Sequence, residues 1–326
     1  MADHPVLTPA MCPPLLAAAL PTTSAAVTLA LALALIAAAA FAGGSSVALA
    51  SLGHRPMQVL LSLTGGVLLG VGMLHLLPHA WMQLGRDLDT TMGWVLAGFF
   101  AMFLLERAFH AHAHHTPDDG CCDHDHDHDP GHHHPVHHKG GGRWAWCGAF
   151  AGLALHSLAD GAALAASVRA DAIHGAGLTA GLATFLAILL HKPLDAGIIA
   201  TLMIESGASP RLRSLVNAAY AAVVPLGAAA FLVSLPFAGG RQDAVLGIAM
   251  AVAAGAFICI AAADLLPEVQ FHSHDRVLLT TALALGLALA WGITVLEKSS
   301  HAHAAHAPAV RIDSDRATAA GSGRGE

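Results

Sequence analysis

Two histidine–aspartate pairs with the same spacing are the residues in this sequence best suited to chemistry. His156 and Asp160 lie in the run LALHSLADGAAL, and His191 and Asp195 lie in the run ILLHKPLDAGII, so each pair has the form H-x-x-x-D. On a helix, side chains at i and i+4 share a face, with Cβ atoms about 5–6 Å apart. From there an imidazole nitrogen and a carboxylate oxygen can both reach one cation at about 2.0–2.2 Å. Two such helices packed face to face would supply two neutral and two anionic ligands to a divalent ion.

Both pairs lie inside long apolar stretches, where an ionised group costs about 2.5–3.5 kcal/mol and usually faces a cavity or an ion path. Lys192 is the one basic residue that no loop or tail can accommodate. The alternative interpretation is that each histidine caps a helix carbonyl and each aspartate pairs with Lys192 for packing. For a single histidine–aspartate pair, this packing interpretation is as good as metal binding. It does not explain well why the same spacing recurs on two consecutive apolar stretches. Gly161 and Gly197 are small residues expected to let the two helices approach closely.

Two further motifs place a pair of polar residues around a proline near the end of an apolar stretch. His75 and His79 stand in GVLLGVGMLHLLPHA, and Asp264 and Glu268 stand in ICIAAADLLPEVQ. A broken helix with two ligands could pass an ion to or from a central site. We interpret all four residues as pathway ligands; a solvated helix end is the competing interpretation, strongest for His79 and Glu268.

A histidine-rich insert separates the third and fourth apolar stretches. Residues 110–138 hold 12 of the 24 histidines together with six aspartates and no large apolar residue, so they cannot form a core and are expected to be disordered. Imidazole, carboxylate and thiol groups suit weak, exchangeable binding of borderline metals such as zinc. The alternative is a low-complexity spacer. The predicted loop ligands are Cys121, Cys122, His124, His126, His128, His132, His133 and His134.

The elements that must position these residues are membrane helices. The chain has 326 residues, of which 55% are hydrophobic and 11% charged, with a mean hydropathy of +0.60, and this composition excludes a water-soluble globular protein. The net charge of −7 gives no reason to expect a nucleic-acid partner. The apolar stretches predict eight spans, at about 23–52, 57–81, 92–109, 144–168, 177–204, 212–235, 243–266 and 277–296.

The distribution of lysine and arginine between the loops predicts the orientation. With an outer amino terminus, the inner loops hold seven basic residues and the outer loops three, so both termini are predicted to lie outside and the insert in the cytoplasm. The fold class is therefore an all-α integral membrane protein, a bundle of eight transmembrane helices. The predicted organisation is an amino-terminal tail at 1–22, three spans within 23–109, the insert at 110–142, five spans within 143–296 and a tail at 297–326.

On these motifs the chain resembles the ZIP (Zrt/Irt-like) family of divalent metal transporters. The resemblance covers residues 57–296 and rests on the eight spans, the histidine-rich cytoplasmic loop, the GxxLGxxxLHLLP run of the second span and the paired motifs of the fourth and fifth spans. It implies a helix bundle that moves zinc, or Fe²⁺, Mn²⁺ or Cd²⁺, toward the cytoplasm, usually as a homodimer. It implies no enzymatic activity. The short loops and alanine-rich spans suggest a bacterial inner membrane.

The chain departs from many members of the family at the fifth span. Those members place an amide or second carboxylate beside the fifth-span ligand and bind two adjacent metals, whereas here Lys192 occupies that position, similar to the subgroup with an H-K pair. An ammonium there would repel a second cation. We therefore expect a single metal held by the two histidine–aspartate pairs, with Ser157 and Lys192 at the second position.

Three other functions remain open at this stage. A cation diffusion facilitator exports metal and also has H-x-x-x-D motifs, but it would have six spans and a folded cytoplasmic carboxyl-terminal domain. An intramembrane zinc hydrolase would need an open water position and a general base, and no H-E-x-x-H motif is present. A metal-responsive receptor would bind the ion without moving it.

Overall fold

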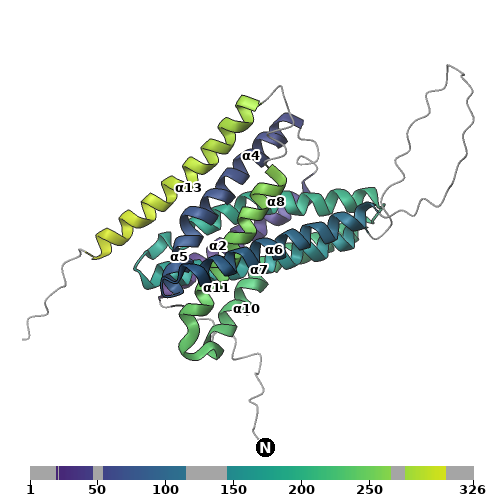
Figure 1. Cartoon of the computed structure of the whole chain (residues 1–326). Helices are drawn as coiled ribbons and strands as arrows, with labels where there is room; N and C mark the ends of the chain where they lie inside the picture. The colour runs from purple at the N-terminus through teal and green to yellow at the C-terminus, as the bar shows by residue number, and fades with distance from the viewer. Residues whose placement is uncertain (1–19, 21, 47–53, 115–144, 266–275, 306–326) are drawn as a thin grey trace, which may run out of the picture.

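The computed structural model describes residues 20, 22–46, 54–114, 145–265 and 276–305, and in these ranges the chain forms helices joined by short turns, with no strand (Figure 1). The all-α prediction is thereby confirmed. The long helices are α2 (Thr23–Ser45), α6 (Leu88–His114), α7 (Ala145–Ile173), α8 (Leu182–Glu205) and α13 (Arg276–Ala305). The shorter ones are α4 (His54–Val71), η2 (Gly72–Leu76), α5 (Leu77–Gln83), η3 (Gly177–Thr179), α9 (Pro210–Ala221), α10 (Val223–Ser234), η4 (Leu235–Arg241), α11 (Gln242–Ile260) and η5 (Ala261–Leu265).

Within the described residues, seven helical segments are long and apolar enough to cross a membrane. One of them, Pro210–Ala263, has 54 residues, which would measure about 80 Å if straight at about 1.5 Å per residue. The hydrocarbon core of a bilayer is only about 30 Å thick. The segment breaks at Gly239, whose φ of 55° and ψ of −128° are not helical. The protein is therefore a multi-pass membrane protein; the count of eight spans, with both termini outside, stays a prediction.

Most of the close packing is between pairs of helices, α2 with α8, α4 with α13, α6 with α11 and α7 with α10. Glycines permit this approach, because a Cβ at Gly66 would overlap the carbonyl oxygen of Leu283 and a Cβ at Gly98 that of Val252. Further along α4, a Cβ at Gly70 would meet Ala290. The residue numbers of the two helices rise together, so α4 and α13 run in the same direction, as the predicted orientation of the second and eighth spans requires.

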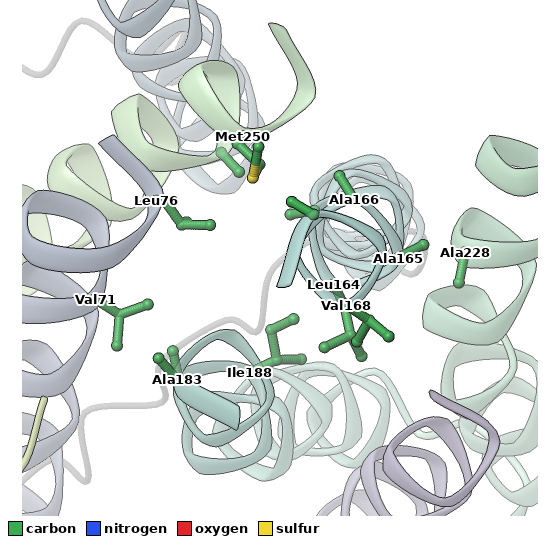
Figure 2. Packing of buried hydrophobic residues seen from close by; sticks show 14 of the residues in the cluster. Val71, Leu76, Leu164, Ala165, Ala166, Val168, Ala183, Ile188, Ala228 and Met250 are labelled. Carbon is green, nitrogen blue, oxygen red and sulfur yellow. The ribbon is translucent and has the colours of Figure 1, made fainter. Parts of the chain in front are cut away.

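Gly161 does not have the role expected from the sequence. A Cβ at this position would overlap the carbonyl oxygen of Val224 on α10, so the glycine lets α7 approach α10 rather than α8. Where α7 and α8 meet, the contact is filled by larger apolar side chains, including Leu164, Val168 and Ile188 (Figure 2). All three are fully buried. The reason is geometric: Gly161 directly follows Asp160, and successive residues point to different faces of a helix.

Two helices change their winding at the predicted proline motifs. Helix α4 passes into the π-helix η2, which contains His75, before α5 begins with a proline in its first turn. The π-helix η5, which contains Asp264, continues α11. π-helical turns are rare and concentrate at functional sites. By contrast, Pro193 lies inside α8 without ending it.

Candidate metal site

The structure brings three of the four predicted central ligands together where α7 passes α8. The Nε2 atoms of His156 and His191 lie 3.2 Å and 3.3 Å from the Oδ2 atom of Asp160. All three side chains are buried, and each offers a ligand atom within 4.8 Å of the others. Helical spacing accounts for the pair on α7, and the packing of α8 against it supplies the third group.

Asp195 lies one helical turn beyond His191, at the edge of this cluster. Its Oδ2 atom is 4.0 Å from the Nε2 atom of His191, and its side chain is 15% exposed, compared with 2% for Asp160. A small movement of this carboxylate would add it to the other three groups.

Lys192 joins the two carboxylates. Its fully buried Nζ atom lies 2.6 Å from Oδ2 of Asp160 and 2.8 Å from Oδ2 of Asp195. With neutral imidazoles, the cluster carries two negative charges and one positive charge. A divalent cation at this place would therefore compete with the ammonium for the same carboxylate oxygens, a consequence that the spacing of the motifs did not reveal.

The two histidines are held differently. The Nδ1 atom of His191 donates to the carbonyl oxygen of Ala187 at 2.7 Å, and its Nε2 atom makes a hydrogen bond to Oδ2 of Asp160 at 3.3 Å. This is the usual arrangement of metal-ligating histidines, whose second nitrogen is fixed by a backbone or carboxylate oxygen. His156 makes no hydrogen bond through either ring nitrogen to any residue the structure describes. A buried imidazole without a hydrogen bond is a group that a bound ion would satisfy.

Tyr220 on α9 completes the cluster and was missed by the sequence interpretation. Its hydroxyl donates to Oδ2 of Asp195 at 3.1 Å and accepts a hydrogen bond from Ser157 at 3.0 Å. Ser157, predicted for the second position, thus contacts Asp195 through Tyr220. The only tyrosine of the chain, within the sixth predicted span, was the available signal.

A second cluster forms around the predicted pathway residues His75 and His79. The Nε2 atom of His79 lies 3.2 Å from Oδ1 of Asp171, and the Nδ1 atom of His75 lies 2.9 Å from Oε2 of Glu297. Asp171 lies in the last turn of α7, and Glu297 lies on α13. Neither acid belongs to a short-range motif, so only the packing of four separate helical pieces brings them to the histidines.

The remaining predicted ligands lie outside the described residues. This holds for Glu268 and for the side chain of Asp264, although the backbone of Asp264 lies in η5. It also holds for the loop ligands Cys121, Cys122, His124, His126, His128, His132, His133 and His134. Their assignment stays a prediction.

Comparison with known families agrees with this arrangement of helices and polar groups. The family model described as "ZIP Zinc transporter" matches residues 24–295, most of the chain. Comparison with curated proteins finds no match. The members of the matched family are transporters of divalent metals, which fits a membrane bundle whose buried polar residues are metal-binding types and argues against an enzyme. Since the match extends over all the described spans, the chain belongs to the ZIP zinc transporter family.

Proposed function

We propose that this protein moves Zn²⁺ across the membrane into the cytoplasm, with His156, Asp160, His191 and Asp195 as the ligands of the transport site. The observation that supports this most directly is the convergence of the first three on one buried position between α7 and α8. Two imidazoles and two carboxylates are a ligand set that zinc favours. Fe²⁺, Mn²⁺ and Cd²⁺ are the other candidate substrates, because such ligands discriminate between divalent metals mainly by geometry and availability.

Binding at this site requires an exchange of cations. The ion loses its water to the four ligands while the ammonium of Lys192 withdraws from Asp160 and Asp195, so the carboxylates are compensated before and after binding. Neutral imidazole and ionised carboxylate are the binding forms. The ion leaves when the carboxylates return to Lys192, and acidification of the cytoplasmic side speeds this release.

The surroundings of the site support an alternating-access cycle. Leu164 and Ile188 are fully buried and lie on α7 and α8 between the central cluster and the predicted outer ends of these helices. On the other side, Tyr220 lines a small cavity beside Arg213 and Asn217. These last two residues also line a cavity of about 610 Å³ between α2, α8 and α9. In this conformation the apolar layer separates the site from the outside.

The test is zinc flux into proteoliposomes that contain a zinc-sensitive dye. We compare the wild type with His191→Ala, with a deletion of residues 110–138, and with the control His174→Ala, an exposed histidine near the end of α7. Wild type, control and, to a large extent, the loop deletion should carry zinc, whereas His191→Ala should not. Flux through His191→Ala at the wild-type rate would contradict the proposed site. No flux of any divalent ion in the wild type would contradict zinc transport and would favour a receptor.

We further propose a location in a bacterial inner membrane, supported by the short loops and alanine-rich spans, and assembly as a homodimer, supported by the family membership. Cross-linking in native membranes measures the second of these directly. A cross-linked species at twice the chain mass, independent of expression level, is the expected result, and a monomer at every expression level would contradict it.

A further inference from the structure

The second cluster consists of His75, His79, Asp171 and Glu297, and the function proposed above assigns it no binding site of its own. We propose that His75, His79 and Asp171 form a second binding site for a divalent cation, separate from the central one. Glu297, which lies beside His75, positions the imidazole of that histidine for the site. This inference goes beyond the proposed transport function, because it holds whichever ion the central site carries.

The two sites are too far apart to be one. Asp171 follows Asp160 by eleven residues on the continuous helix α7, which corresponds to about 16 Å along the axis. The apolar side chains of Leu164, Val168 and Ile188 fill the core between them (Figure 2). An ion bound at the second cluster therefore shares no ligand with the central cluster.

The three proposed ligands are already gathered. Each offers a ligand atom within 4.8 Å of the others; His75 and Asp171 are buried and His79 is half-buried. The Nε2 atom of His75 lies 3.9 Å, and that of His79 3.2 Å, from an oxygen of Asp171. Three protein ligands leave a fourth position for water, as in zinc sites whose ligands exchange.

A hydrogen bond from His79 and a close carboxylate at His75 hold the two imidazoles with Nε2 on the side of Asp171. The Nδ1 atom of His79 donates to the carbonyl oxygen of His75 at 2.7 Å. Around His75, Oε2 of Glu297 lies 2.9 Å from Nδ1, and the hydroxyl of Ser167 lies 3.0 Å from Nε2. A carboxylate or backbone oxygen beside one ring nitrogen, with the other nitrogen turned to the site, is the usual surrounding of a metal-ligating histidine.

A short chain of hydroxyl groups reaches Nε2 of His75. Thr184 on α8 donates to the hydroxyl of Ser167 at 3.0 Å, which leaves the proton of Ser167 free to point at Nε2 of His75. A bound ion would take the place of this hydroxyl proton on Nε2 of His75.

The carboxylate of Asp171 has no basic lysine or arginine partner of the kind found at the central site. Within the described part of the chain, its ion pairs are with His75 and His79 alone, and it accepts a further hydrogen bond from the backbone N–H of Gly181 at 2.7 Å. A buried carboxylate needs compensating charge. A divalent cation bound between Asp171 and the two imidazoles would supply it.

The backbone also departs from a regular helix at this place. His75 lies in the π-helix η2 and His79 in the following helix α5. The rings lie 4.5 Å apart between centroids. The wider π-helical turn thus brings two imidazoles together beside the end of α7, and such turns are concentrated at functional sites.

The test is the equilibrium binding of zinc to the full-length protein, dialysed against a zinc buffer that leaves weak sites empty. His79→Gln and Asp171→Asn should each bind one zinc ion fewer per chain than the wild type, because they lack the second site. His191→Ala should lose the ion of the central site instead. The double variant Asp171→Asn with His191→Ala should lose both ions. His174→Ala is the matched control, a histidine three residues beyond Asp171, and should bind as the wild type does. Glu297→Gln should retain the ion with an affinity lowered about 10–100-fold.

Unchanged zinc stoichiometry and affinity in folded His79→Gln would overturn the proposal. Folding is checked by the elution profile and the melting temperature without zinc. If Asp171→Asn fails to fold, His79→Gln is the decisive variant, because the side chain of His79 is only partly buried. Zinc flux in the same variants separates this proposal from the transport function. If wild-type flux is absent while His79→Gln still loses its ion, the second site stands and the transport proposal fails; the converse result rejects only the second site.

Discussion

Lys192 compensates two buried carboxylates that would otherwise need another cation. Its Nζ atom lies within 2.8 Å of both Asp160 and Asp195, and no part of its side chain is exposed. Removing one member of a buried ion pair costs about 3–5 kcal/mol, because the remaining charges stay buried and unpaired. The residue therefore stabilises the metal-free protein, and it would compete with an ion at the proposed site.

Lys192→Met should separate these two effects. We expect a lower melting temperature without metal, corresponding to about 3–5 kcal/mol, and a larger rise of the melting temperature on adding zinc than in the wild type. Thermal unfolding at a series of zinc concentrations measures both. The control is Lys192→Met combined with Asp195→Asn, which removes one unpaired carboxylate and should recover part of the metal-free stability. Equal melting temperatures of wild type and Lys192→Met without metal would contradict the role assigned to the ammonium.

At the scale of helices, the sequence predicted what lies within one element and missed what lies between elements. The i, i+4 spacing was sufficient to place His156 beside Asp160, because helical geometry determines that distance. Tyr220 and Asp171 were missed because they reach their partners only through packing between helices. The role of Gly161 was wrong for the same reason: a small residue predicts a close contact but does not identify the neighbouring helix.

The close packing of α6 against α11 can be tested with two glycines on the same helix. A Cβ at Gly98 would overlap the backbone of Val252, whereas a Cβ at Gly93 meets nothing within 4 Å. Gly98→Ala should lower stability by about 1–3 kcal/mol through overpacking. Gly93→Ala should raise stability by about 0.5–1 kcal/mol, because alanine loses less conformational freedom in a helix. Thermal unfolding in detergent compares the two; destabilisation of equal size by both would contradict the packing described here.

At the scale of the whole molecule, the arrangement of polar and apolar layers determines what the protein must do to transport an ion. Two clusters of metal-ligating side chains lie at different depths along α7, with Leu164 and Ile188 between them. An ion cannot pass this layer without a movement of α7, α8 or the helices around them. Since the first pair of proposed ligands lies on α7 and the second on α8, such a movement would also change the distances among them, and access to the site would then be coupled to its affinity.

Accessibility of the apolar layer from outside is the observable that tests this coupling. In a variant without the native cysteines, Ile188→Cys should react with a membrane-impermeant thiol reagent more slowly than Leu178→Cys by about tenfold or more, because a minor outward-open state is expected at about 0.1–10%. Leu178 is 74% exposed, on η3 beyond the end of α7, so its labelling from outside also tests the predicted orientation. During zinc transport the labelling of Ile188→Cys should accelerate, and adding His191→Ala should abolish the acceleration. Labelling as fast as that of Leu178→Cys, with or without zinc, would show that the layer does not close the site.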